Sequence, residues 1–209
     1  MYYQFPRTTC EMPQSGVIKQ PVSSAINMLT VFGLVVLLIV RKYDWASGIL
    51  VLSLVLFELW HTLSHAIHMK NNIQAIGIHT MAYIIAICIG LLIFARTGSI
   101  SLYFVWFAVF MDILVISLRK KIGNHWSVIT GIIIIGTLLV ENYNKFPNPI
   151  QEMFPYFALM FVLGVICFLL ETFYCQAAMN KKQLPYHAIV EIIVLVFTLT
   201  FANAVLMWK

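Results

Sequence analysis

The sequence predicts an all-α protein of the polytopic membrane class, folded as a seven-transmembrane-helix bundle. Of its 209 residues, 61% are hydrophobic and only 10% are charged, and the mean hydropathy is +0.90. Soluble domains carry about one-quarter charged residues, so this composition is typical of a chain that lies largely in lipid. The apolar residues fall into seven runs near the roughly 20 residues that a helix needs to cross the hydrocarbon core. The alternating pattern of membrane-spanning strands is absent, which favours helices.

Each predicted helix is bounded by short polar segments, from "RKYDW" after the first to "MNKKQLP" before the last. Residues 1–23 form a polar N-terminal arm whose three prolines argue against one regular helix. The arm lacks the basic start, apolar core and cleavage site of a secretory signal, so the first apolar run is expected to remain as a span. Residues 24–209 then form a single transmembrane domain. The predicted helices cover residues 24–40, 47–68, 73–95, 99–118, 124–140, 153–175 and 186–207.

The net charge of +5 resides in short loops such as "RKY" and "LRKKIG". Basic residues there orient helices and meet anionic headgroups, so the bilayer itself is the expected partner. No basic stripe or aromatic platform indicates nucleic acid, and no feature indicates an oligomeric state. Seven spans place the chain ends on opposite sides of the membrane, and the N-terminal side carries more Lys and Arg. Positive-charge counting therefore favours a cytoplasmic N-terminus, in a membrane that the sequence does not identify.

Ionisable residues within the predicted helices gather toward one side of the membrane. Such residues are costly in lipid, and their default interpretation is functional. The second helix ends on the N-terminal side, where the third and the last begin, so polar residues far apart in sequence should meet there. This set comprises Ser64, His65, His68, His79, His187 and Glu191. His125, Glu171 and Asp112 also lie toward this side, where snorkelling to the interface or pairing with a loop base explains them.

The stretch "ELWHTLSHAIH", residues 58–68, places its polar side chains on one helix face. At 100° per residue they fall within an arc of about 120°. In the last helix "HAIVE" places His187 and Glu191 at i and i+4, side by side. These two and histidines from neighbouring helices could form a zinc site with an open position. We predict His68 and His187 as metal ligands, joined by His79 or Glu191, with His61, His65 and Glu58 hydrogen-bonding to the ligands.

The same motifs resemble the CREST superfamily of seven-span membrane hydrolases and receptors, particularly its alkaline ceramidase branch. Ser64 and His68 in "SHAIH" match a Ser-x-x-x-His unit that ends the family's second span. "HAIVE" stands where the family has His-x-x-x-His at the start of its last span. The N-terminal "CEMPQSGVIKQPVSSAIN" is similar to the ceramidase arm, in which Cys-Glu precedes a polar stretch. The resemblance covers the layout of nearly the whole chain and rests on few diagnostic residues.

Two positions depart from the family pattern. His79 stands where the family has an Asp in its third span, and Glu191 stands where it has the second His of the last motif. The family's inventory of three histidines and one carboxylate therefore survives with two roles exchanged. A decayed site would have no reason to keep this inventory, so we favour an exchange around the same metal.

The resemblance has further implications for the N-terminal arm. Ceramidases bind calcium there, and Glu11 corresponds to one possible ligand, but Gln20 stands where another Glu is usual, which argues against Ca²⁺. The resemblance also allows a disulfide between Cys10 and Cys175 if the N-terminal side is luminal. Charge counting instead places that side in the cytoplasm, so both orientations remain open.

Taken with the resemblance, these residues predict a zinc-dependent hydrolase that cleaves a lipid amide, with ceramide giving a sphingoid base and a fatty acid. Zn²⁺ would lower the pKa of a bound water toward 7. Ser64 is placed to hydrogen-bond the developing oxyanion. Whichever of Glu191 and His79 does not bind metal is the candidate proton shuttle. The lipid substrate would enter between helices.

Other functions use the same residue types. A receptor-like or ion-conducting relative could use the cluster to pass protons or to hold a structural metal. A b-type haem could take His68 with His79 or His187 as axial ligands, which would leave Ser64 and Glu191 unexplained. A retinal protein is excluded because the last helix offers no lysine within its membrane portion.

Overall fold

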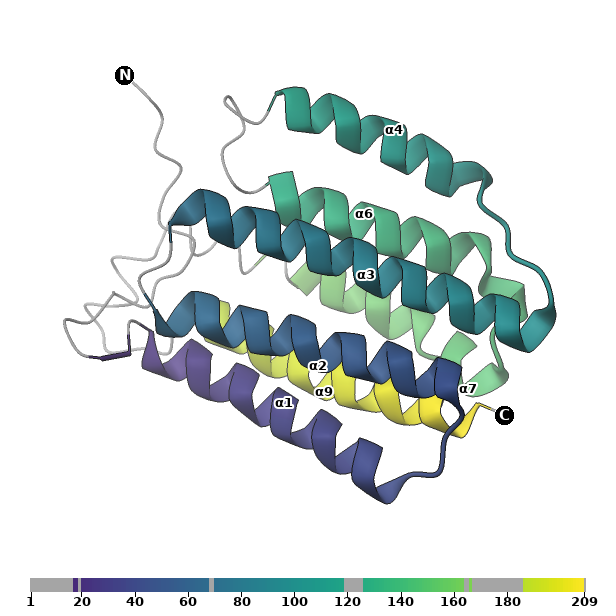
Figure 1. The fold of residues 1–209 in the computed structure, drawn as a ribbon, viewed down its shortest axis with the longest axis horizontal. Coiled ribbons are helices and arrows are strands. Elements are labelled where there is room, and N and C mark those ends of the chain that lie inside the picture. The colour runs from purple at the N-terminus through teal and green to yellow at the C-terminus, as the bar shows by residue number, and fades with distance from the viewer. Residues whose placement is uncertain are drawn as a thin grey trace.

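The computed structural model describes residues 17–18, 20–67, 70–118, 126–163, 166 and 186–208, with the side chains of 71, 128–129 and 186–187 left aside. Within these residues the ordered structure is helical and contains no strand (Figure 1). Residues 154–163 are also helical. The named elements are α1 (Pro21–Val40), α2 (Trp45–Ala66), α3 (Asn71–Thr97), α4 (Tyr103–Ser117), α6 (Trp126–Glu141), the 3₁₀ turn η2 (Tyr143–Lys145), α7 (Asn148–Gln151) and α9 (Tyr186–Met207).

Four of these helices, α1, α2, α3 and α9, are long and apolar enough to cross a membrane. They have 20, 22, 27 and 22 residues, which at about 1.5 Å per residue span at least the thickness of a bilayer core. The apolar helices α4 and α6 are shorter, with 15 and 16 residues. The chain is therefore an all-helical protein with four candidate membrane spans, and the count of seven spans stays a prediction.

Two helix starts differ from the predicted boundaries for identifiable reasons. Helix α1 begins at Pro21, three residues before the predicted start, so residues 21–23 belong to the helix and not to the arm. Proline suits this position because the first helical N–H has no intrahelical partner. Helix α4 begins only at Tyr103, because Gly98 ends α3 with φ 68° and the Glu141 carboxylate accepts the N–H groups of Tyr103 and Phe104.

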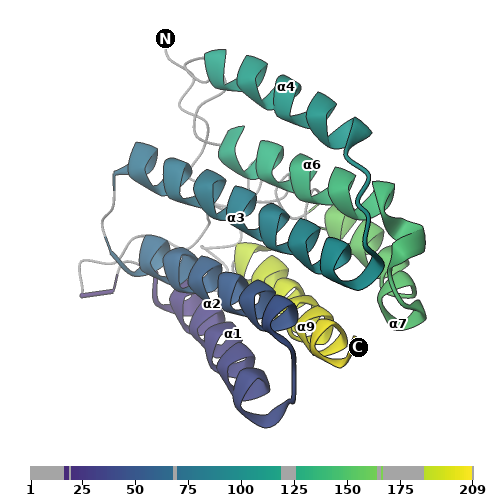
Figure 2. The same cartoon turned by 45° about the vertical axis from the view of Figure 1, so that its right-hand side comes forward.

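The long helices run antiparallel to their neighbours in sequence, so the bundle has two distinct ends (Figures 1 and 2). At the left in Figure 1, here called the Gln20 end, α1, α3, α6 and α9 begin while α2 and α4 finish. The opposite end, the Trp208 end, holds the close of α9 and the connections α1–α2 and α3–α4. Helix α2 packs on α1 and α9 and also on α3, which packs on α6, and α6 packs on α4.

The core lies between α1, α2, α3, α6 and α9 and is almost purely apolar. Leu34, Leu50, Leu92 and Val205 have no exposed surface. Large apolar side chains also cover much of the outside, notably Phe32 and Ile39 of α1 and Phe104, Trp106 and Phe110 of α4. A protein in water rarely exposes so continuous an apolar surface, whereas a helix in lipid requires it. The exposed residues thus agree with a multi-pass membrane protein.

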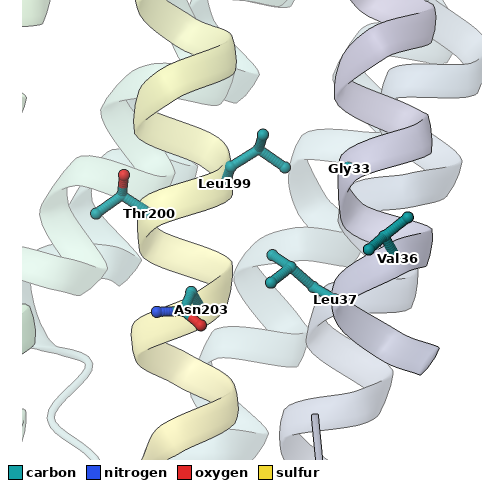
Figure 3. A pocket seen from close by; sticks show the side chains of 6 residues that line it. All are labelled: Gly33, Val36, Leu37, Leu199, Thr200 and Asn203. Atoms are coloured by element: carbon teal, nitrogen blue, oxygen red, sulfur yellow. The ribbon is translucent and has the colours of Figure 1, made fainter. Parts of the chain in front are cut away.

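A groove of about 350 Å³ lies on the outer side of the α1–α9 contact (Figure 3). It is lined by Gly33, Val36, Leu37, Leu199, Thr200 and Asn203. The two helices approach closely here, because a Cβ at Gly33 would lie 2.7 Å from Leu199 Cδ2. Leu199 follows Glu191 by eight residues, about 12 Å along α9, so the groove lies well away from the ionisable residues at the Gln20 end.

Candidate functional site

Two histidines of α2 and one carboxylate of α9 meet at the Gln20 end. His61 and His65 lie one helical turn apart in the last two turns of α2, on the same face. Glu191 lies in the second turn of α9, which packs on α2. The three residues therefore approach from two antiparallel helices whose ends are level in the bundle.

The reactive atoms of this histidine–glutamate group lie at short range. His65 Nε2 is 3.1 Å from His61 Nε2 and 3.2 Å from Glu191 Oε1. One ligand atom from each residue lies within 4.8 Å of the other two. His65 and Glu191 are buried, and the His61 side chain keeps 21% of its surface exposed. Two imidazole nitrogens and a carboxylate oxygen, with one partly open side, could hold a metal ion.

Gln20 connects the start of α1 to this group. Its Oε1 lies 2.7 Å from His65 Nδ1, and its backbone N–H donates to the His65 carbonyl at 3.0 Å. On the other side, the buried Glu58 Oε2 lies 3.9 Å from His61 Nδ1, at the outer limit of an ion pair. The two histidines therefore have a polar neighbour at the ring nitrogen that faces away from the group.

A second cluster at the same end joins α3 to α4. Asp112 Oδ2 lies 2.8 Å from His79 Nε2 and accepts a 2.7 Å hydrogen bond from the Tyr83 hydroxyl. Asp112 is 2% exposed, and its Oδ1 has no hydrogen-bond partner among the described residues. The Trp126 ring meets His79 edge to face, with centroids 4.6 Å apart. This His79–Asp112 cluster is therefore buried, hydrogen-bonded and titratable.

The structure distributes the predicted site residues differently from the sequence interpretation. Glu191, a predicted ligand, lies with His61 and His65, which were predicted to support the ligands from behind. His79 instead pairs with Asp112. The Ser64 hydroxyl is buried and donates to the His61 carbonyl at 2.7 Å. His68, Glu11, Cys10, Cys175, His125 and Glu171 lie outside the described residues, as does the side chain of His187.

Sequence reasoning did not single out Gln20 or Asp112 as parts of these clusters. Gln20 was considered only as a departure from a calcium ligand, and Asp112 as a partner for a loop base. One signal was available for Asp112: a carboxylate late in α4 should lie level with a histidine early in the antiparallel α3. For Gln20 the signal was weaker, since a polar residue before a helix-starting proline is ordinary.

No protein-family model, curated protein or solved structure matches the chain. The two clusters therefore have to be interpreted from their own chemistry. Each pairs a buried carboxylate with an imidazole, an arrangement that can bind a cation or move a proton but that contributes little as a purely apolar contact.

Proposed function

We propose that His61, His65 and Glu191 hold a zinc ion. The observation that carries this proposal is the spacing of 3.1 and 3.2 Å around His65 Nε2. Ligand atoms bound to tetrahedral zinc at 2.0–2.1 Å lie about 3.3 Å from one another, so little movement would be needed to complete a site. Imidazole and carboxylate are also the ligand types that catalytic zinc sites use.

We further propose that the protein is a seven-span membrane hydrolase that cleaves the amide bond of a ceramide-like lipid. Three protein ligands are typical of catalytic zinc sites, which keep one position for water or substrate. Zinc in such a site supplies a water with a pKa near 7 and polarises a carbonyl. The position at the Gln20 end suits a lipid whose amide lies near the membrane surface. The substrate class itself comes from the resemblance to alkaline ceramidases.

Further residues take supporting roles under this proposal. With Glu191 assigned to the metal, His79 becomes the candidate proton shuttle, and Asp112 orients its ring through the 2.8 Å hydrogen bond. Ser64 would stabilise the developing oxyanion only after its hydroxyl leaves the His61 carbonyl. His68 and His187, each within one turn of a described ligand in sequence, remain candidates for a fourth ligand.

The direct test is elemental analysis of detergent-purified protein together with hydrolysis of a fluorescent ceramide. We expect about one zinc per chain, lost in a His61→Ala, His65→Ala double variant along with hydrolysis. The matched control is His79→Ala, which should keep the zinc but lower the hydrolysis rate. Absence of zinc from the wild type, or its retention in the double variant, would refute the proposed centre.

A second candidate function, proton handling without catalysis, is favoured by the His79–Asp112 cluster. A buried carboxylate that bonds an imidazole and a tyrosine hydroxyl, with one oxygen unpartnered among the described residues, is typical of proton relays in membranes. In this case a proton on His65, and not a metal, would balance Glu191. Proton flux into vesicles containing purified protein, abolished by Asp112→Asn, would favour this alternative if no zinc is found.

A further inference from the structure

We propose that Gln20 is a positioning residue that selects the tautomer of His65 and so presents its Nε2 to the metal. This inference rests on the proposed zinc centre. It concerns a side chain that touches neither the ion nor a substrate and that acts only through the histidine ring.

The chemistry of the amide determines which ring nitrogen carries hydrogen. The oxygen of a glutamine side chain has lone pairs and no hydrogen, so it can only accept. Because Gln20 Oε1 lies 2.7 Å from His65 Nδ1, that nitrogen must be the donor. In a neutral imidazole the lone pair then resides on Nε2, the atom that faces His61 and Glu191. Metal-binding histidines generally have their second ring nitrogen held in this way.

Gln20 is itself firmly held. It is 6% exposed, and its backbone N–H donates to the carbonyl of the same His65 whose ring it contacts. Its carbonyl accepts from both the N–H and the hydroxyl of Ser24, at 3.1 and 2.7 Å. Backbone bonds on both sides therefore fix the residue between the start of α1 and the end of α2.

The position of Gln20 in its helix also argues for a special role. It is the N-cap of α1, a place where Ser, Thr, Asp and Asn are preferred because their short side chains accept a helix N–H. The Gln20 side chain makes no such capping bond to the described part of α1 and extends to His65 instead. The longer side chain sacrifices the cap and gains the contact with the imidazole.

A deprotonated Nε2 beside the Glu191 oxygen would be unfavourable without a cation between them. Two electron-rich atoms face each other at 3.2 Å, with His61 Nε2 at 3.1 Å completing the group. By holding the hydrogen on Nδ1, Gln20 therefore favours filling this position with a metal ion. In the neutral His65 ring, the opposite tautomer would direct a hydrogen toward Glu191 and block coordination.

The experiment compares zinc affinity, by chelator competition, in the full-length wild type and three variants. Gln20→Leu removes the acceptor at similar size, and we expect affinity to fall about 10- to 100-fold. Gln20→Glu keeps an acceptor oxygen and should stay close to the wild type. The matched control is Asn27→Leu, which removes another buried amide of α1 whose Nδ2 has no hydrogen-bond partner among the described residues.

A second readout follows the tautomer itself. In ¹⁵N-histidine NMR of metal-free protein, the wild type should show His65 protonated at Nδ1, and Gln20→Leu should shift it toward a tautomer mixture. Unchanged affinity and tautomer in Gln20→Leu, with zinc bound by the wild type, would overturn this inference alone. A wild type that binds no zinc would overturn both this inference and the centre on which it rests.

Discussion

The two ends of the bundle treat their carboxylates differently. At the Trp208 end, Asp44 accepts from the N–H groups of Ala46 and Ser47 as the N-cap of α2 and pairs with Arg96. Glu141 there accepts from backbone N–H groups at the start of α4. At the Gln20 end, Glu191 faces His65 and Asp112 faces His79.

The difference separates structural from functional acids. Backbone N–H groups and guanidinium donate at every physiological pH, so carboxylates that face them stay ionised and fix helix ends. Imidazole changes its protonation near neutral pH and also binds metals, so a carboxylate facing it has more than one stable state. Each prediction below changes one end and uses the other for comparison, in order of decreasing effect.

The largest effect is expected from Glu191→Gln. The substitution keeps the size of the side chain but removes the anionic ligand, so zinc affinity should fall by more than the roughly 100-fold that supporting residues contribute. Chelator competition measures the loss. The same change at the other end, Glu141→Gln, should leave the affinity unchanged, and equal losses in both variants would show that the effect is general unfolding.

Asp112→Asn should produce the next largest effect. The amide still reaches His79 but can no longer stabilise its charged ring, so the hydrolysis rate should fall about 100-fold, the lower range for proton transfer. Zinc content should not change, because Asp112 is not part of the histidine–glutamate group. A parallel loss of zinc would contradict the separation of the two clusters.

Arg96→Ala should affect stability and leave zinc affinity unchanged. Asp44 would lose its charged partner, although 35% of its side chain is exposed to solvent, which weakens the ion pair. We expect the free energy of unfolding in detergent to fall by about 1 kcal/mol. A change in zinc affinity would instead indicate that the two ends are coupled.

The smallest effect is the acid sensitivity of Asp44. Burial raises its pKa, but the N–H of Ser47, the Arg96 charge and the N–H of Ala46 together hold the pKa below its ordinary value of 3.8. Because the folded pKa is the lower one, the stabilisation is complete above pH 3.8 and is lost as the pH falls through the folded pKa. The stability difference between wild type and Asp44→Ala should therefore shrink only in strong acid, as unfolding measured at several pH values would show.

Several features of the site could be predicted because they depend on helix geometry alone. The period of 3.6 residues places His61 and His65 on one face, and the length of a span determines that α2 ends where α9 begins. From these two facts it follows that the histidines of α2 and Glu191 should lie at the same level. The predicted starts of α2 and α3 are within two residues of the observed ones for the same reason.

The chain by itself therefore determined the helical class, the apolar surface and the level at which ionisable residues gather, since these follow from composition and periodicity. Only the tertiary structure decided which histidine faces which carboxylate. Helix rotation and side-chain conformation brought Glu191 to His65 and Asp112 to His79, and both depend on packing between elements far apart in sequence. The contact of Gln20 with His65 joins residues 45 positions apart, and no local pattern encodes it.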